Sequence, residues 1–304
     1  MADVQQLTPG RVVVAGASGL IGGALVASLR ADGVPVTRLV RRPAEAADEI
    51  EWDPTRRPVD PAVLDGAAAV VGLNGASIGR FPWSRSYKHT LRWSRLAPTQ
   101  ALASAVRALG DGAPLFVSAS AVGYYPTQPR GPLTEASPAG HGFLSQLTAE
   151  WERTARTAGD RVALLRTAPI VHPEGVLKPL MLLTRAGLSG PIGRGTQAWP
   201  WISLPDEVAA IRHVIDRGLT GPVNLSGPTR ATANDLGFAL AMRMNRPYLL
   251  RAPVWGMKLV LGSETVDALL ACDMHVVPDV LTASGFAFSQ PTVKAAVADA
   301  VPPA

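Results

Sequence analysis

Three glycines near the N-terminus have the spacing of a phosphate-binding turn. Gly16, Gly19 and Gly22 form the pattern Gly-x-x-Gly-x-x-Gly, after an apolar, β-branched run at residues 11–15 and before apolar residues at helical spacing that end at Gly33. In a strand–turn–helix unit, such glycines let the backbone approach a pyrophosphate, and the N–H groups of the first helical turn bind its oxygens. The sequence therefore predicts a dinucleotide site here rather than a purely structural turn.

A pair of arginines follows the second predicted strand, at residues 34–40. An NAD-preferring site usually has an acidic residue at this place, where it binds the ribose hydroxyls of the adenosine. This chain has Arg41 and Arg42 instead, and guanidinium groups suit a 2′-phosphate by charge and by bidentate geometry. We therefore expect NADP rather than NAD, the alternative being that both arginines are only exposed to solvent.

The elements that must position these residues alternate between strands and helices. Apolar runs typical of buried parallel strands, and the helical periodicity between them, place strands at 11–15, 34–40, 67–75, 114–123 and 162–171. They place helices within 16–33, at about 84–109 and at 142–159. This alternation predicts right-handed βαβ units, and hence an α/β fold with a doubly wound parallel sheet of the Rossmann type. Binding sites in such sheets lie at the carboxyl ends of the strands.

The alternation weakens after residue 172, where a different organisation is expected. Substrate-side insertions are predicted at about 173–205, which includes a stretch rich in proline and glycine. From residue 251 onward, short helical segments are separated by proline or glycine. The expected division is an NADP-binding Rossmann-type domain at 1–250 and a small, mostly helical C-terminal domain at 251–304, on the substrate side.

Longer motifs point to a known family. They are GASGLIG (16–22), SASAVGYY (118–125), LTEASPAGHGFLSQLTAEWE (133–152), GPIGRGTQAWPWISLPDEVAAI (190–211) and NRPYLLRAPVWGMKLVLG (245–262). In type and order they resemble the extended short-chain dehydrogenases/reductases. The resemblance is closer to the atypical NAD-dependent epimerase/dehydratase-like subgroup that has an extra C-terminal domain of unknown function, and it covers almost the whole chain.

This resemblance implies a set of coenzyme contacts and one catalytic residue. The pyrophosphate would lie on the glycine loop, the 2′-phosphate on the arginines, and the adenosine and its ribose beside LNGASI (73–78). The implied coenzyme-binding residues are Gly16, Ser18, Gly19, Leu20, Ile21, Gly22, Arg41, Arg42, Asn74, Gly75, Ser118 and Arg166. Ser120 matches the superfamily's catalytic serine, whose hydroxyl bonds the substrate oxygen. The alternative is a serine at a strand end that bonds only the backbone.

The superfamily's Tyr-x-x-x-Lys pair is missing from this sequence. In that pair the lysine and the coenzyme lower the pKa of the tyrosine, but the corresponding helix has FLSQL at 143–147, and no tyrosine has a lysine four residues later. Other proton donors are Tyr124 and Tyr125, directly after the fourth strand, and His141, in the loop before the helix. The candidate catalytic residues are therefore Ser120, Tyr124 and His141.

Three interpretations of the function remain open. The chain is an NADP-dependent oxidoreductase or epimerase acting on a small carbonyl or hydroxyl compound, or a binding module that senses NADPH, or a structural protein with an empty nucleotide fold. The intact glycine loop argues against the third. An anionic substrate is favoured by a short basic cluster, the alternative being a solvated surface. The cluster consists of Arg80, Arg85, Lys88, Arg92 and Arg95.

Composition excludes other classes of protein. The 304 residues, 47% hydrophobic and 17% charged, suffice for a large core, and the single Cys272 excludes a disulfide framework. Since Glu135, His172, Glu174 and His275 are dispersed, we expect no metal site. The net charge of +5 is scattered, so we expect no nucleic-acid partner.

The N-terminal sequence and the hydropathy pattern bear on the compartment. The chain has no basic region leading into an apolar stretch and no run of about 18 apolar residues. We therefore expect a cytoplasmic protein with no membrane partner. Related folds often dimerise, which leaves a homodimer open.

Overall fold

The computed structural model describes residues 10–303, and its centre is a seven-stranded sheet in which all strands are parallel. The strand order is β3 (Glu49–Glu51), β2 (Val36–Val40), β1 (Val12–Ala15), β4 (Ala69–Gly72), β5 (Leu115–Ala121), β6 (Val162–Thr167) and β9 (Gly221–Leu225). The chain adds strands on both sides of β1, so the order reverses between β1 and β4. This is the topological switch point at which such sheets bind ligands. The predicted α/β fold with a doubly wound parallel sheet is confirmed.

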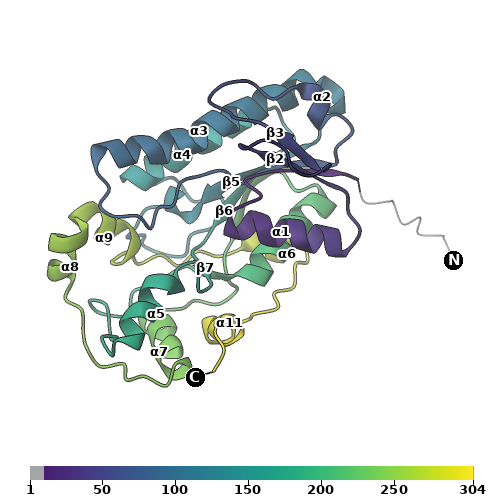
Figure 1. Cartoon of the computed structure of the whole chain (residues 1–304). Coiled ribbons are helices and arrows are strands. Elements are labelled where there is room, and N and C mark those ends of the chain that lie inside the picture. The colour runs from purple at the N-terminus through teal and green to yellow at the C-terminus, as the bar shows by residue number, and fades with distance from the viewer. Residues whose placement is uncertain (1–9, 304) are drawn as a thin grey trace.

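Helices cover both faces of this sheet (Figure 1). One face is covered by α1 (Leu20–Ala31) and α6 (Leu204–Arg217), the other by α2 (Pro61–Leu64), α3 (Arg85–Ala108) and α4 (Phe143–Arg156). Strand side chains alternate between the two cores: Val12 and Val14 pack toward α1 and α6, whereas Val13 and Ala15 pack toward α2 and α3. Burial on both faces explains why the sequence of β1 is continuously apolar.

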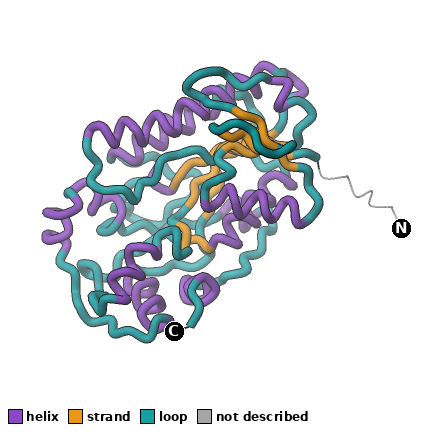
Figure 2. The backbone as a smooth tube through the Cα atoms, in the orientation of Figure 1, coloured by secondary structure: helices purple, strands orange, loops and turns teal. Residues whose placement is uncertain are grey.

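The remaining elements are short and are joined by longer loops (Figure 2). They are β7 (Ile170–Val171), β8 (Ile202–Ser203), α5 (Leu177–Arg185), α7 (Ala233–Arg243), α8 (Val254–Leu261), α9 (Ser263–Leu269), α10 (Asp279–Ala283) and α11 (Val293–Ala300). The strands β7 and β8 pair in parallel. Side chains of α5, α7 and α11 share a third core. The helix α9 instead packs against the start of α4.

The structure divides the fifth predicted strand in two. We predicted one strand over 162–171, but β6 ends at Thr167 and β7 begins at Ile170, because Pro169 has no N–H to give to a neighbouring strand. The carbonyl of Pro169 instead accepts a bond of 3.2 Å from the N–H of Ile202 in β8.

Two elements of the main sheet and its cover were not predicted. The strand β3 has three residues and α2 has four, which is too short for either periodicity to appear in the sequence. The strands β1, β2, β4, β5 and β6 and the helices α1, α3 and α4 were predicted. Among residues 10–303, no helix combines the length and the apolar character needed to cross a membrane.

Candidate functional site

The glycine loop joins β1 to α1 with little room for side chains. Gly16 has φ +85°, and a Cβ on it would lie 2.8 Å from the backbone of Leu73. A Cβ on Gly22 would lie 2.2 Å from the carbonyl oxygen of Gly16. The first position needs a left-handed backbone and the other needs close packing, and both requirements select glycine. The loop therefore lies directly against the segment that follows β4.

The first turn of α1 is open to an anion. Its N-cap, Gly19, provides no side-chain cap, and the turn contains no acidic residue. Ser18 and Gly19 are exposed, while Leu20 and Ile21 are half-buried. Uncapped N–H groups and the positive end of the helix dipole together form an anion site. The structure thus brings the predicted residues of the loop together around one helix N-terminus.

Asn74 provides an unsatisfied polar atom next to this loop. Leu73 continues β4, since its N–H bonds the carbonyl of Ala15 at 2.9 Å, and Asn74 and Gly75 follow it. The Oδ1 atom of Asn74 is buried and has no hydrogen-bond partner among the described residues. A buried acceptor without a donor is costly, so this atom suits a hydroxyl group of a bound ligand such as a ribose.

The arginines after β2 differ in their surroundings. Arg42 bonds both oxygens of Glu49, at 2.8 and 2.7 Å, and Arg38 bonds both oxygens of Asp48, at 2.9 and 2.8 Å. The Arg42 guanidinium lowers the pKa of Glu49 to about 2, so this carboxylate stays charged. Arg41 is exposed and belongs to none of the ion pairs found in residues 10–303. Of the two predicted phosphate ligands, Arg41 is the one whose donors are not already used.

Ser120 belongs to a buried network at the end of β5. Its hydroxyl donates to Oε1 of Glu152 at 2.7 Å. Arg166, on the neighbouring strand β6, bonds both oxygens of Glu152, at 2.8 and 3.0 Å. An ionised carboxylate only accepts hydrogen bonds, so the hydroxyl hydrogen of Ser120 points to Glu152. Ser118 lies deeper, fully buried, and donates to the carbonyl of Ala119 at 3.1 Å.

The two tyrosines after β5 contact the same arginine. The Cζ of Arg166 lies 3.7 Å from the centre of the Tyr124 ring. The hydroxyl of Tyr125 accepts a bond of 2.9 Å from Arg166 and donates one of 2.6 Å to Asn224. Burial raises the pKa of Tyr125 to about 12, so this residue keeps its proton. The half-buried Tyr124 is the tyrosine better placed to exchange one.

Arg166 also donates to the carbonyl of Glu135 at 3.1 Å. It is almost completely buried, and its hydrogen bonds to Glu152, Tyr125 and Glu135 are all made within the protein. Burial alone would lower the pKa of Arg166, but the hydrogen bonds and the negative charge of Glu152 raise it above the ordinary value. Arg166 thus holds Glu152 and the tyrosines in place, and its predicted contact with the coenzyme stays a prediction.

The place of the Tyr-x-x-x-Lys pair is filled by apolar side chains. Phe143 and Leu147, the first and last residues of FLSQL, pack with Trp83 and Leu91, and the Trp83 and Phe143 rings lie 5.8 Å apart. None of these groups can exchange a proton. His141 is exposed just before α4, and the structure gives its ring no bond that would aim it at the site.

The sequence analysis did not predict Glu152 as a residue of the candidate site, and it predicted Arg95 only as part of the basic cluster. Glu152 was not singled out, although Ser145, Thr148 and Glu152 form a polar row at helical spacing on the buried side of α4. Arg95 was included only as one member of the basic cluster. Two other members of that cluster are paired, Lys88 with Glu264 and Arg92 with Glu150.

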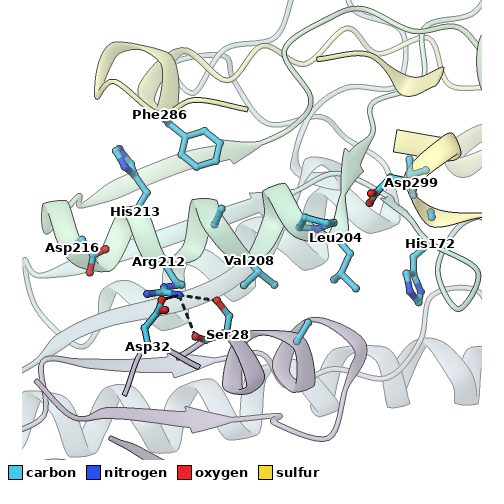
Figure 3. A pocket seen from close by; sticks show the side chains of 15 residues that line it. Ser28, Asp32, His172, Leu204, Val208, Arg212, His213, Asp216, Phe286 and Asp299 are labelled. Carbon is cyan, nitrogen blue, oxygen red and sulfur yellow. Dashed lines mark hydrogen bonds and ion pairs between the residues drawn. The ribbon is translucent and has the colours of Figure 1, made fainter. Parts of the chain in front are cut away.

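An open groove lies elsewhere in the molecule. It has a volume of about 790 Å³ and runs between α1 and α6, where Arg212 bonds Ser28 and Asp32 (Figure 3). None of the predicted site residues lines it. Within residues 10–303, no three His, Cys, Asp or Glu side chains gather closely enough to hold a metal ion.

The fold and the site define a class: a Rossmann-type α/β protein with a glycine loop built to receive a dinucleotide. The chain belongs to the NAD dependent epimerase/dehydratase family, whose model matches residues 12–225. A second model, a domain of unknown function called DUF1731, matches residues 252–300. The family resemblance predicted from the motifs is confirmed.

Relatives match along nearly their whole length. Epimerase family protein Mb2239 of Mycobacterium bovis is 39% identical over 287 residues, which are 93% of this chain and 94% of the relative. Epimerase family protein SDR39U1 of Bos taurus is 32% identical over 297 residues, 96% and 99% of the two chains.

Solved structures agree in fold. The crystal structure of human epimerase family protein SDR39U1 with NADPH superposes with a TM-score of 0.85 at 28% identity, covering 95% of this chain and 98% of that chain. MoeE5 in complex with UDP-glucuronic acid and NAD gives a TM-score of 0.74 at 21% identity, covering 95% and 97%. The second likeness is one of fold alone.

Proposed function

We propose that this protein binds NADP(H) across the carboxyl ends of β1, β4 and β5. The observation on which this rests is the open glycine loop, with its uncapped helix N-terminus beside the buried, unpartnered Oδ1 of Asn74. The pyrophosphate fits the first turn of α1, and a ribose hydroxyl fits Asn74. The human relative SDR39U1, whose structure contains NADPH, supports the same class of coenzyme for this chain.

The preference for the phosphorylated coenzyme rests on Arg41. Its guanidinium has no ion-pair partner among the described residues, whereas Arg42 is already bound to Glu49. Arg42 also neutralises that carboxylate, which would otherwise repel a 2′-phosphate. Arg41 then contacts the phosphate directly, and Arg42 makes its surroundings compatible with negative charge.

The reaction we propose is hydride exchange with a small carbonyl or hydroxyl compound, as an oxidoreductase or an epimerase. When bound, the nicotinamide supplies or accepts the hydride. In this chain Ser120 presents its oxygen to the site while its hydrogen is held by Glu152. Ser120 therefore orients a substrate hydroxyl by accepting a bond from it. Tyr124, whose ring lies against the Arg166 cation, is the group that exchanges the proton.

A second function is favoured by two specific observations. The Ser120 hydroxyl donates to Glu152, and apolar side chains occupy the place of the Tyr-x-x-x-Lys pair. A chain with these two changes keeps the coenzyme site but loses the usual proton path. The alternative proposal is therefore a binding module that senses NADPH without turnover.

Thermal unfolding with each of the four nicotinamide coenzymes tests the binding proposal. A ligand at about 100 times its Kd raises the free energy of unfolding by about 2.7 kcal/mol, so NADPH and NADP⁺ should raise the Tm clearly more than NADH and NAD⁺. Arg41→Ala should weaken NADPH binding about tenfold or more, the value of a charge-assisted contact, and leave NADH binding unchanged. Arg217→Ala, at the exposed end of α6, is the matched control.

The outcomes separate the two functions. Oxidation of bound NADPH by any member of a carbonyl panel, abolished by Tyr124→Phe, supports the enzyme. Binding without oxidation by the whole panel supports the sensing module. If none of the four coenzymes stabilises the protein, both proposals are wrong.

A further inference from the structure

Arg95 of α3 is a half-buried cation that has no anionic partner among residues 10–303. None of the ion pairs within residues 10–303 includes it, and burial lowers its pKa to about 10. Two other cations of the same helix, the half-buried Lys88 and the exposed Arg92, each bind a glutamate. Even partial burial of a charge without a counter-charge is costly, and an anionic ligand would offset that cost.

The guanidinium is held in place by neutral groups only. Its two Nη atoms donate to the carbonyls of Leu91 and Ala76, at 3.0 and 3.1 Å, and its Cζ lies 5.3 Å from the centre of the Trp151 ring. A guanidinium has five N–H donors, so these two bonds leave donors over. These contacts fix the orientation of the guanidinium group, and its positive charge stays available to an anionic ligand.

The backbone of the coenzyme segment lies on this group. A Cβ on Gly75 would be 3.3 Å from the Cζ of Arg95 and 3.4 Å from one of its Nη atoms. Gly75 directly follows Asn74, whose Oδ1 has no partner. Arg95 is therefore a neighbour of the segment that we assign to the coenzyme.

Arg95 lies on the part of α3 that extends beyond the carboxyl edge of the sheet, where the candidate site is. Leu102 reaches the end of β4, since its Cδ1 would be 3.2 Å from a Cβ on Gly72. Arg95 precedes Leu102 by seven residues, or about 10 Å of helix, and α3 runs back from the carboxyl edge. Arg95 thus lies beyond that edge. Trp151, which its guanidinium faces, directly precedes Glu152, the partner of Ser120.

We propose that Arg95 binds a carboxylate or phosphate group of the substrate, beside the nicotinamide. This inference rests on the proposed function and adds the class of substrate to it. Arg95 contacts the chain after β4 at Gly75 and Ala76, and the Trp151 ring that it faces directly precedes Glu152, the partner of Ser120 at the end of β5. A fixed guanidinium fork suits a bidentate oxyanion. The apolar Leu147 occupies the place of the missing lysine and packs on Leu91, one turn before Arg95, so the cation of the site comes from α3 instead of α4.

Inorganic phosphate titrated into NADPH-saturated protein tests the binding half of this proposal, at constant ionic strength and with calorimetric detection. NADPH keeps the phosphate away from Arg41. Arg95→Met should weaken phosphate binding about tenfold or more, and Arg95→Lys should retain part of it. Arg92→Met, an exposed arginine of the same helix that is paired with Glu150, is the control and should bind as the parent does.

A matched pair of carbonyl compounds tests the catalytic half. Glyceraldehyde 3-phosphate and glyceraldehyde differ only in the phosphate, and both are offered with NADPH. The parent should prefer the phosphorylated compound in kcat/KM, and Arg95→Met should remove the preference through KM. The Tm of Arg95→Met should lie between that of the parent and about 2 °C above it, because methionine keeps the apolar stem and removes the unpaired charge.

Four results would overturn the assignment. They are unchanged phosphate binding in Arg95→Met, no phosphate binding by the parent, an about tenfold loss of NADPH affinity in Arg95→Met, and a Tm lowered by more than about 5 °C. The third would assign the cation to the coenzyme, and the fourth would make it structural. Failure of the parent to bind NADPH at all is a different result, and it refutes the proposed function instead.

Discussion

Glu207 is the residue whose titration should be visible in the stability of the protein. It lies in the first turn of α6, fully buried, and accepts a bond of 2.8 Å from the Thr167 hydroxyl at one oxygen. The other oxygen has no partner among the described residues. Burial raises its pKa from 4.5 to about 8, so between these values the folded state holds a proton that the unfolded state has lost.

The sign of the pH dependence follows from this difference. Where the native state binds more protons than the unfolded state, the free energy of unfolding falls as pH rises. Glu207 should therefore lower stability progressively from about pH 4.5 to about pH 8. Glu207→Gln removes the effect, and it should be more stable than the parent by about 1–3 kcal/mol above pH 8, with little difference near pH 5.

Denaturant unfolding at several pH values measures this difference between parent and variant. Glu174→Gln removes an exposed carboxylate and should differ from the parent by a constant amount. A constant difference for Glu207→Gln as well would contradict the prediction.

At the same scale, the site residues that could be predicted from the sequence are those recognised by their position next to a predicted strand. The glycine loop and Arg41 follow predicted strands and Ser120 lies near the end of one, and the parallel sheet places these strand ends at one edge. Glu152 and Arg95 depend instead on which helix packs on which strand. The bond from Ser120 to Glu152 joins residues 32 positions apart, and no spacing rule connects a strand-end serine to the inner face of a later helix.

At the scale of elements, the β1–α1 unit offers a matched pair of glycines. A Cβ on Gly22 would lie 2.2 Å from the carbonyl oxygen of Gly16, whereas a Cβ on Gly23 would have no contact closer than 3.6 Å. Gly22→Ala should push α1 away from the loop, lower the Tm and abolish NADPH binding. Gly23→Ala should keep binding and gain about 0.5–1 kcal/mol from its helix propensity.

Calorimetric titration with NADPH and thermal unfolding of both variants measure these effects. Equal NADPH affinity in Gly22→Ala and the parent would show that the loop tolerates the displacement and does not contact the coenzyme. Equal loss in both variants would trace the effect to α1 as a whole.

Elements were predictable where length and periodicity were sufficient. The strands β1, β2, β4 and β5 and the long helices show clear apolar periods. The short β3 and α2 do not, and their place is set by pairing with β2 and by packing on α3. The break between β6 and β7 depends on Pro169, whose effect on a continuous apolar run is visible only once the neighbouring strand is known.

At the scale of the whole molecule, the C-terminal segment completes the main core. Met274, Val276 and Leu281 are buried in the same cluster as β1, β4 and β5. Leu133 bonds the backbone on both sides of Val276, at 2.8 and 2.9 Å, and Asn224 of β9 donates to Val277 at 2.8 Å. The segment after residue 251 therefore shares its core with the sheet.

Because the C-terminal segment and the sheet share one core, we expect the full chain to unfold in a single cooperative transition. In differential scanning calorimetry, the van't Hoff enthalpy should equal the calorimetric enthalpy, which is about 0.7 kcal/mol per residue near 60 °C. NADPH contacts only the Rossmann-type part in our proposal, yet it should shift the entire transition, because the C-terminal helices cannot stay folded after the sheet has opened.

An internal control lies in α8, which has no buried residue and exposes Trp255, Leu259 and Val260. Leu259→Ser should leave a single transition with a nearly unchanged Tm. Leu281→Ser, in the shared core, should lower the Tm of the whole transition by several degrees. The reason is that burying an unpaired hydroxyl and losing a leucine side chain each cost about 1–3 kcal/mol. Two transitions, only one of them moved by NADPH, would mean that the C-terminal segment folds independently and that its contacts with the sheet contribute little to the stability of either part.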